Sequence, residues 1–558
     1  ERDTNNFLYV GQFNQTPSST KETHFRSSTF NTATICFPPT ATITATNQAN
    51  AVVSGNARFI LHILSLLSLS SFTPFPLEYC ISIFSSIEFP TVFAFNNMIR
   101  CHAKANSPPS ESIAIYSAML RRRRFVKPNQ HTFTFALHAC TKRAASGLGS
   151  GVQVHAHVVK LGFARDVFVR NALIHLYCEC GSSVESFKRV FEEEEDTLCS
   201  DVVTWNSVLA GLVRNGEIRD AEKVFDEMPE RDVVSWSTMI MGYVQNGLLE
   251  DGLECFSVMR EKGIRPNEAA LVSVLSASAQ LGLLESGRFV HSTIESLKFR
   301  ITVPVGTALV DMYAKCGCIE KSRALFESIS GKDIWTWNVM ICGLASHGLA
   351  KDALALFHKF LSEGFIPVNV TFVGVLNACS MGGLVSEGKR YFNLMVDCYG
   401  IQPEMEHYGC MVDLLARAGL VDEAVHLIET MTVEPDPVLW ATLLDACKVH
   451  GFVDMGEKIG NKLIQLDPMH DGHYVQLAGI YAKARKWEDV VRVRKLMIEK
   501  VSKKVAGWSL VELEGGIHHF VAGDKDHDCS SDIYRMLETI GQGITAAGYP
   551  SVHLTCVA

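Results

Sequence analysis

Apolar and polar positions along most of the chain follow the pattern of paired helices. In the segment Val202–Gly216 the apolar residues fall at helical spacing: Val203, Trp205, Val208, Leu209 and Leu212. This spacing predicts a helix that ends at Gly216, because glycine adopts the positive φ of a helix terminus at little cost. A second helix is expected over about 218–228. Ala221 would lie where the two helices cross, and Phe225 would fill the groove beside it.

The same pattern returns through the chain at intervals of 31 to 36 residues. A glycine marks the end of each predicted first helix, at Gly181, Gly216, Gly247, Gly282, Gly317, Gly348, Gly383, Gly419 and Gly451. A small residue stands five places after each glycine, and several units carry Phe four places further on. One helical hairpin cannot bury its apolar face alone, so neighbouring units must stack. The sequence therefore predicts an all-α solenoid of helix-turn-helix repeats.

Residues 1–56 show no helical or strand period. They are rich in Ser and Thr and poor in acidic residues, which is typical of a disordered leader or of an organellar transit peptide. The run Phe59–Phe72 is the most apolar of the chain, but it is shorter than the roughly 20 residues that a membrane span needs. We interpret it as a buried helix.

The charge and the cysteine content exclude some classes of protein. The net charge of −9 excludes a generally basic, nucleic-acid-binding coat but leaves room for a local basic track. The 17 cysteines are scattered, which is typical of reduced thiols rather than of a disulfide framework. We interpret the pairs Cys178/Cys180 and Cys316/Cys318 as inert thiols, and His518 and His519 as a polar pair on a hairpin.

The alternation of repeat lengths resembles the pentatricopeptide repeat proteins of plant organelles, in particular their subclass with standard, long and short repeats. Residues 233–267, VVSWSTMIMGYVQNGLLEDGLECFSVMREKGIRPN, resemble the standard repeat. Tetratricopeptide repeats fit less well, because they usually have Gly at the eighth position, where this chain has Leu209, Ile240, Val310 and Ile341. The resemblance implies a right-handed superhelical solenoid. Its repeats would be 57–91, 92–129, 130–166, 167–201, 202–232, 233–267, 268–302, 303–333, 334–368, 369–404 and 405–436.

The C-terminal part resembles the extension of the same subclass. Residues 437–504 are similar to its E-type extension and residues 505–549 to the E-plus continuation, with a tail at 550–558. The deaminase of many such proteins needs His-x-Glu and Cys-x-x-Cys, and neither pattern occurs here. A P-loop and a dinucleotide loop are missing too. We therefore expect no catalytic residue, metal, cofactor, small-molecule substrate or membrane span, and no enzyme.

In the family, the fifth and the last residue of each repeat face an RNA base. Carried over to this chain, the pairs are Asn96/Asn129, Asn171/Asp201, Asn206/Asp232, Ser237/Asn267, Thr307/Asp333 and Asn338/Val368. The alternative is that an Asn at the fifth position only caps a helix. The fifth position of the long repeats, Thr134, Val272 and Val373, should read poorly. The tryptophans Trp205, Trp236 and Trp337 are expected in the core. The family's code implies U for Asn/Asp, A for Ser/Asn, G for Thr/Asp and C for Asn/Asn.

Two basic runs stand out in an acidic chain. Arg121–Arg124 is interpreted as a solvated helix tip, and Lys483–Lys504 either as a phosphate-facing track or as a solvated helix face. The resemblance implies a single-stranded-RNA-binding protein of the mitochondrion, or alternatively of the chloroplast. It would direct C-to-U editing and recruit a deaminase-bearing partner, or another editing factor, through 437–549. The alternatives are a factor for RNA stability, splicing or translation, and a protein-binding scaffold.

Overall fold

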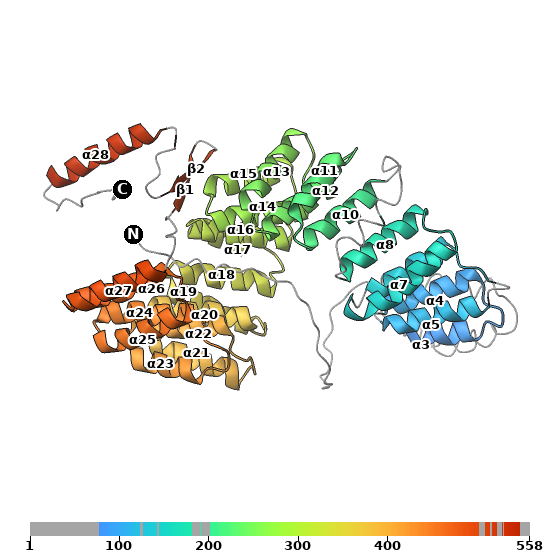
Figure 1. Cartoon of the computed structure of the whole chain (residues 1–558). Coiled ribbons are helices and arrows are strands. Elements are labelled where there is room, and N and C mark those ends of the chain that lie inside the picture. Colours follow the sequence, from blue (N-terminus) through green and yellow to red (C-terminus); the bar gives the residue numbers. More distant parts are fainter. Residues whose placement is uncertain are drawn as a thin grey trace.

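The computed structural model describes residues 77–105, 107–122, 126–141, 144–180, 190, 201–500, 508–513, 516–521, 527 and 529–546. Helical hairpins follow one another along this part of the chain (Figure 1). The first helices of successive hairpins are α4 (Val92–Lys104), α6 (Gln130–Thr141), α8 (Val167–Glu179), α10 (Val202–Arg214), α12 (Val233–Gln245), α14 (Glu268–Leu281), α16 (Val303–Lys315), α18 (Ile334–Ser346), α20 (Asn369–Gly382), α22 (Met405–Arg417), α24 (Pro437–His450) and α26 (Asp471–Lys483).

The second helices form the other layer of the solenoid. They are α5 (Pro109–Arg121), α7 (Ala144–Lys160), α11 (Ile218–Glu227), α13 (Leu249–Glu261), α15 (Leu284–Ser296), α17 (Ile319–Ser328), α19 (Ala350–Ser362), α21 (Val385–Asp397), α23 (Val421–Thr430), α25 (Val453–Leu466) and α27 (Trp487–Lys500), and α3 (Leu77–Ser85) precedes α4. Each first helix packs against the next first helix, whereas successive second helices touch one another much less. The first helices therefore form the more closely packed of the two rows. In a curved array the more closely packed row lies on the inner side.

The recurring glycines end the first helices as the sequence predicts. Gly216 has φ of 78° and Gly317 has φ of 83°, and each of the other described members of the series also has a positive φ. Gly181 lies outside the described residues, as do residues 57–76 with the apolar run Phe59–Phe72. The small residues at the helix crossings are buried, with Ala221 and Ala353 at 0% exposure. Trp205, Trp236 and Trp337 are buried in the core as expected.

Short repeats differ from standard ones mainly in the second helix. The second helices α11 and α17 have 10 residues, against 13 in α13 and α19. The first helices α10, α12, α16 and α18 all have 13 residues. Shortening the outer helix thus leaves unchanged the inner helix that carries the candidate residues.

A small β-hairpin follows the last helical pair and folds back onto the solenoid. Strands β1 (Trp508–Leu513) and β2 (Gly516–Val521) are antiparallel, with Trp508 opposite Val521. The Glu512 carboxylate accepts hydrogen bonds from the backbone N–H groups of Glu285 and Ser286 at the start of α15, at 2.8 and 2.7 Å. The hairpin lies beside α15 in Figure 1. Helix α28 (Ser530–Ala546) follows it.

Candidate nucleic-acid interface

The fifth residue of each repeat sits inside the first helix rather than at its cap. Asn96, Asn171, Asn206, Ser237, Thr307 and Asn338 are each the fifth residue of their helix. The last residue of the repeat stands immediately before the next first helix. Asp201, Asp232, Asn267 and Asp333 accept a hydrogen bond there from the backbone N–H three residues on. The capping role therefore belongs to the last residue, and capping does not explain the fifth.

Three of the pairs are joined by a direct hydrogen bond between the fifth and the last residue of the same repeat. The Asn96 Nδ2 donates to Asn129 Oδ1 at 3.0 Å, and the Asn206 Nδ2 donates to Asp232 Oδ1 at 3.1 Å. The Asn267 Nδ2 donates to the Ser237 hydroxyl at 3.1 Å. Neighbouring first helices thus hold two polar side chains side by side at the same end.

Two further pairs meet through a hydroxyl of the following helix. The Thr204 Oγ1 lies 2.6 Å from both Asn171 Oδ1 and Asp201 Oδ1. The Thr336 Oγ1 lies 2.7 Å from the Thr307 Oγ1 and 2.7 Å from Asp333 Oδ1. The sequence reasoning missed these hydroxyls. The signal that could have found them is a Ser or Thr at the third position of the next repeat.

The sixth pair is different. Asn338 is 2% exposed, and neither its amide oxygen nor its amide nitrogen has a partner among the described residues. Its companion Val368 has no polar side chain to offer. An unpaired buried amide costs free energy. This repeat is therefore the least satisfied of the six in the absence of a ligand.

Asp201 and Asp232, two aspartates of the pairs, are held ionised. Partial burial alone would raise the pKa of Asp201, but hydrogen bonds from Thr204 and Asn171 outweigh it and leave that pKa below its ordinary value. Burial likewise opposes ionisation of Asp232, and hydrogen bonds from Ser235 and Asn206 again lower its pKa overall. At neutral pH both side chains can only accept hydrogen bonds.

Apolar side chains stand exposed at the second residue of many first helices. Their exposed fractions run from 44% to 66%, where an apolar side chain would normally be buried, and they belong to Phe93, Phe168, Val203, Val234, Trp335 and Val438. Sequence reasoning missed this row too, because these residues look like part of the apolar helical pattern. Their position in the unit, three residues before each fifth residue, is the signal.

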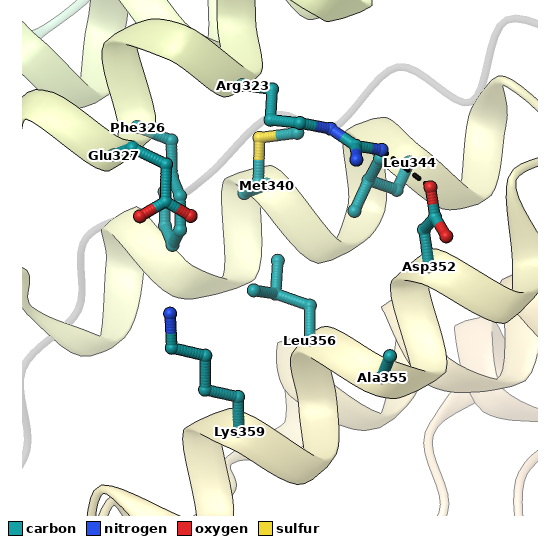
Figure 2. A pocket seen from close by; sticks show the side chains of 9 residues that line it. All are labelled: Arg323, Phe326, Glu327, Met340, Leu344, Asp352, Ala355, Leu356 and Lys359. Atoms are coloured by element: carbon teal, nitrogen blue, oxygen red, sulfur yellow. Dashed lines mark hydrogen bonds and ion pairs between the residues drawn. The ribbon is translucent and has the colours of Figure 1, made fainter.

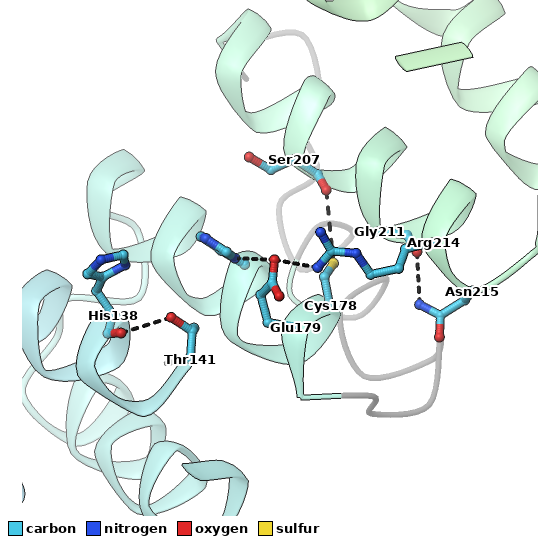
Figure 3. Close-up of polar contacts among 9 residues, drawn as sticks. His138, Thr141, Cys178, Glu179, Ser207, Gly211, Arg214 and Asn215 are labelled. Carbon is cyan, nitrogen blue, oxygen red and sulfur yellow. Dashed lines mark hydrogen bonds and ion pairs between the residues drawn. The ribbon is translucent and has the colours of Figure 1, made fainter. Parts of the chain in front are cut away.

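Cations occupy the thirteenth residue of several first helices, two turns beyond the fifth on the same face. They are Lys104, Arg214, Lys315, Arg417 and Lys483. Most have acidic or carbonyl partners. Lys315 pairs with Asp311 at 2.9 Å and Arg417 with Asp413 at 2.8 Å. Figure 3 shows Glu179 of α8 facing Arg214 of α10, with which it forms an ion pair.

In the two predicted basic runs, some side chains are exposed and others form ion pairs or hydrogen bonds within the protein. Arg121 and Arg122 are exposed at the end of α5, whereas Arg123 and Arg124 lie outside the described residues. In the run Lys483–Lys504, Arg492 pairs with Asp489 at 2.8 Å, and the Lys483 Nζ donates to the Lys448 carbonyl at 2.8 Å. Their role as a phosphate-facing track stays a prediction.

The remaining candidates for chemistry are the cysteine pairs and two histidines. Burial raises the pKa of the Cys178 thiol to about 12 and that of Cys316 to about 11, as expected of inert thiols. His518 lies on β2, with its Nδ1 3.0 Å from His527 Nε2, and His519 Nε2 lies 3.2 Å from Glu250. Within the described ranges, no cluster of three His, Cys, Asp or Glu could hold a metal ion. No described helix is long and apolar enough to span a bilayer.

One groove lies between the two helical layers, among α17, α18 and α19 (Figure 2). It has a volume of about 240 Å³ and includes Phe326, Met340, Leu356 and Lys359. The Arg323–Asp352 ion pair, at 2.6 Å, closes one end. None of the candidate base-facing residues lines it.

Comparison with known families matches much of the chain. Residues 200–233 and 231–280 match "PPR repeat family", and residues 307–334, 335–365, 370–399 and 406–434 match "PPR repeat". Residues 450–512 match "E motif".

Named relatives agree with these matches. A pentatricopeptide repeat-containing protein of Arabidopsis thaliana is 40% identical over 524 residues, covering 91% of this chain and 81% of the relative. Another from the same plant, named as chloroplastic/mitochondrial, is 37% identical over 485 residues, covering 85% and 70%. The crystal structure of the maize pentatricopeptide repeat protein PPR10 overlaps 93% of each chain, with a TM-score of 0.45 and 15% identity. The chain therefore belongs to the plant pentatricopeptide repeat proteins and carries their E motif.

Proposed function

We propose that this chain is a sequence-specific single-stranded RNA-binding protein. The observation that carries the proposal is the row of polar pairs, one pair at each of several junctions between neighbouring first helices. A single strand with its bases splayed out can present one Watson–Crick edge to each repeat, as helical-repeat readers of RNA do. A duplex hides these edges and should not bind.

The last residue of each repeat separates two classes of base. An ionised Asp such as Asp201 or Asp232 can only accept, so it suits the imino N–H of U or of G. An Asn such as Asn129 or Asn267 can also donate, so it can meet the unprotonated ring nitrogen of C or of A. The charge of one side chain thus decides whether an imino proton is required.

The fifth residue of each repeat selects the size of the base. The longer amide of Asn suits a small pyrimidine, whereas the short hydroxyl of Ser237 or Thr307 leaves room for a purine. Combined with the last residue, the repeats should read C at 92–129, U at 167–201 and 202–232, A at 233–267 and G at 303–333. Repeat 334–368 should prefer pyrimidines weakly. The RNA runs 5′ to 3′ along the repeats.

Two further features support RNA over a protein ligand. The exposed apolar second residues offer flat contact surfaces for bases next to the polar pairs. The cations at the thirteenth position lie on the same helical face, where they can exchange their acidic partners for phosphate groups. A protein-binding scaffold needs neither the polar pairs nor this register.

We further propose that the RNA is an organelle transcript and that binding selects a cytidine for C-to-U editing. Support comes from the E motif at 450–512 and from a relative named as chloroplastic/mitochondrial. The mitochondrion is the first candidate compartment and the chloroplast the second. Residues 437–549 would contact a deaminase-bearing pentatricopeptide repeat protein or another editing factor, and that partner would carry out the deamination.

Gel shifts test the binding, and editing in a knockout plant tests the role. The purified protein should shift a single-stranded RNA containing the expected base order, and a duplex of the same sequence should not compete. Equal affinity for the duplex would overturn base reading. Loss of C-to-U conversion at one organelle site supports the editing role. Normal editing with altered transcript ends, splicing or translation would favour a stability, splicing or translation factor instead.

A further inference from the structure

A buried hydroxyl lies behind several of the candidate pairs. It belongs to the third residue of the next first helix. Four such residues are Thr132, Thr204, Ser235 and Thr336, and each is fully buried. Because water cannot reach these positions, the hydroxyl must hydrogen-bond to protein atoms. Thr132, Thr204 and Thr336 contact both the fifth and the last residue of the preceding repeat. Ser235 contacts only the last residue, Asp232.

At two junctions the hydroxyl holds the amide oxygen of the fifth residue. The Thr132 Oγ1 donates to Asn96 Oδ1 at 2.7 Å and accepts the Asn129 backbone N–H at 3.1 Å. The Thr204 Oγ1 lies 2.6 Å from Asn171 Oδ1 and also 2.6 Å from Asp201 Oδ1, so its one proton is shared between these two acceptors. An amide whose oxygen is engaged in this way keeps its NH₂ group for the last residue and for a base. Without the hydroxyl, the amide could turn over and exchange its donor for its acceptor.

The type of fifth residue and the third residue of the next repeat are related, with one exception. Each candidate Asn is followed by a Ser or Thr at the third position of the next repeat: Asn96 by Thr132, Asn171 by Thr204, Asn206 by Ser235 and Asn338 by Thr371. Where the fifth residue is Thr134, Ser237 or Val272, the third residue is Val169, Ala270 or Val305. Ser237 and Val272 have no amide to orient, and neither does Thr134. Thr307 is an exception, because it has no amide and is followed by the hydroxyl of Thr336. A hydroxyl thus follows every candidate Asn, but it reaches the amide only at Asn96 and Asn171, whereas the Asn206 amide oxygen and the Asn338 amide have no partner among the described residues.

We propose that this third residue is a positioning residue for base recognition by the preceding repeat. At the Asn96 and Asn171 junctions it fixes the orientation of the Asn amide and leaves the base of its own repeat unaffected. The inference rests on the proposed RNA-binding function and adds to it a specificity-determining side chain outside the fifth and last positions.

The test uses the full chain and a pool of random single-stranded RNA, with selection by affinity and sequencing of the bound fraction. Thr204→Val removes the hydroxyl and keeps the shape. It should lower the preference for U at repeat 167–201 by about three- to tenfold, the range expected for one lost hydrogen bond. The base preference of repeat 202–232, which contains Thr204, should not change. Thr204→Ser should restore the preference, because it returns the hydroxyl.

A second site and a matched control complete the design. Thr132→Val should weaken the preference for C at repeat 92–129 in the same way. Thr442→Val makes the same chemical change at a hydroxyl that donates to the Val438 carbonyl of its own helix, and it should alter no base preference.

The outcomes separate the inference from the proposed function. A wild-type chain that selects no bases overturns the proposed function, and the inference falls with it. A wild-type chain that selects bases, with Thr204→Val either unchanged at repeat 167–201 or weakened equally at every repeat, overturns the inference alone. Failure of Thr204→Ser to restore the preference also overturns it, because packing rather than the hydroxyl would then be the cause.

Discussion

Asp232 serves two neighbouring repeats at once. Its Oδ1 accepts the backbone N–H of Ser235 at 2.9 Å, which caps α12, and the Asn206 amide at 3.1 Å, which completes a candidate pair. The fold thus places this last residue accurately because its side chain caps the next helix. The hydrogen bond that caps the helix also fixes the side chain that would face a base, so RNA binding need not order that side chain.

The substitution Asp232→Asn separates these two roles. Asn caps a helix about as well as Asp, so the free energy of unfolding should change by less than about 1 kcal/mol. The preferred base at repeat 202–232 should move from U toward C, because an amide can donate to the unprotonated ring nitrogen. Selection from random RNA measures the preference. A large drop in melting temperature with no change of base would show that Asp232 is structural only.

The charge of Asp232 also predicts a pH dependence of stability. Its pKa is below the ordinary value of 3.8 in the folded chain, so ionisation stabilises the fold at pH above that value. This contribution is lost as the pH falls through the lowered pKa. The free energy of unfolding of the wild type minus that of Asp232→Asn should therefore decrease below pH 3.8. Urea unfolding of both chains at several pH values measures it, and a difference independent of pH would contradict the account.

At the scale of helices, most of the fold can be predicted from the sequence. The glycine period predicts the helix ends, because only glycine takes φ near 78° without strain, as at Gly216. The small residues predict where helices cross. The fifth and last residues could be named from the repeat register alone. The hydroxyl of Thr204 could not, because its contact with Asn171 spans two repeats and depends on how one helix stacks on the next.

Close packing at the helix crossings predicts the cost of enlarging a small residue. A Cβ added to Gly287 in α15 would lie 2.3 Å from the Met312 sulfur, and Met312 is fully buried. Gly287→Ala should therefore destabilise the chain by about 1–3 kcal/mol. Gly149→Ala is the matched control, because its Cβ would meet nothing within 4 Å and Ala favours a helix. Denaturant unfolding of both variants gives the comparison, and equal stabilities would contradict the packing.

At the scale of the whole molecule, the β-hairpin connects the C-terminal extension to the middle of the repeat array. Helix α15 has no side-chain cap of its own, and the Glu512 carboxylate supplies one from more than 200 residues away. His519 and Glu250 add a second contact at 3.2 Å. No sequence pattern indicates this contact, because Glu512 resembles any other polar residue of a strand.

Removal of the Glu512 charge should release this end of α15. In Glu512→Gln the backbone N–H groups of Glu285 and Ser286 lose their ionised acceptor. Their hydrogen exchange should speed up by about tenfold, while amides within α14 stay protected. Glu499→Gln, at an exposed glutamate of α27, is the control. Unchanged exchange at both amides would show that the hairpin does not cap α15 in solution.

The central claim is that the fifth and last residues read one base per repeat. The most direct measurement is base selection by the double variant Ser237→Asn with Asn267→Asp, which gives repeat 233–267 the pair found at 202–232. The account predicts that the preferred base of this repeat changes from A to U and that the bases chosen by all other repeats stay the same. An unchanged preference at this repeat, or equal weakening at every repeat, would contradict it.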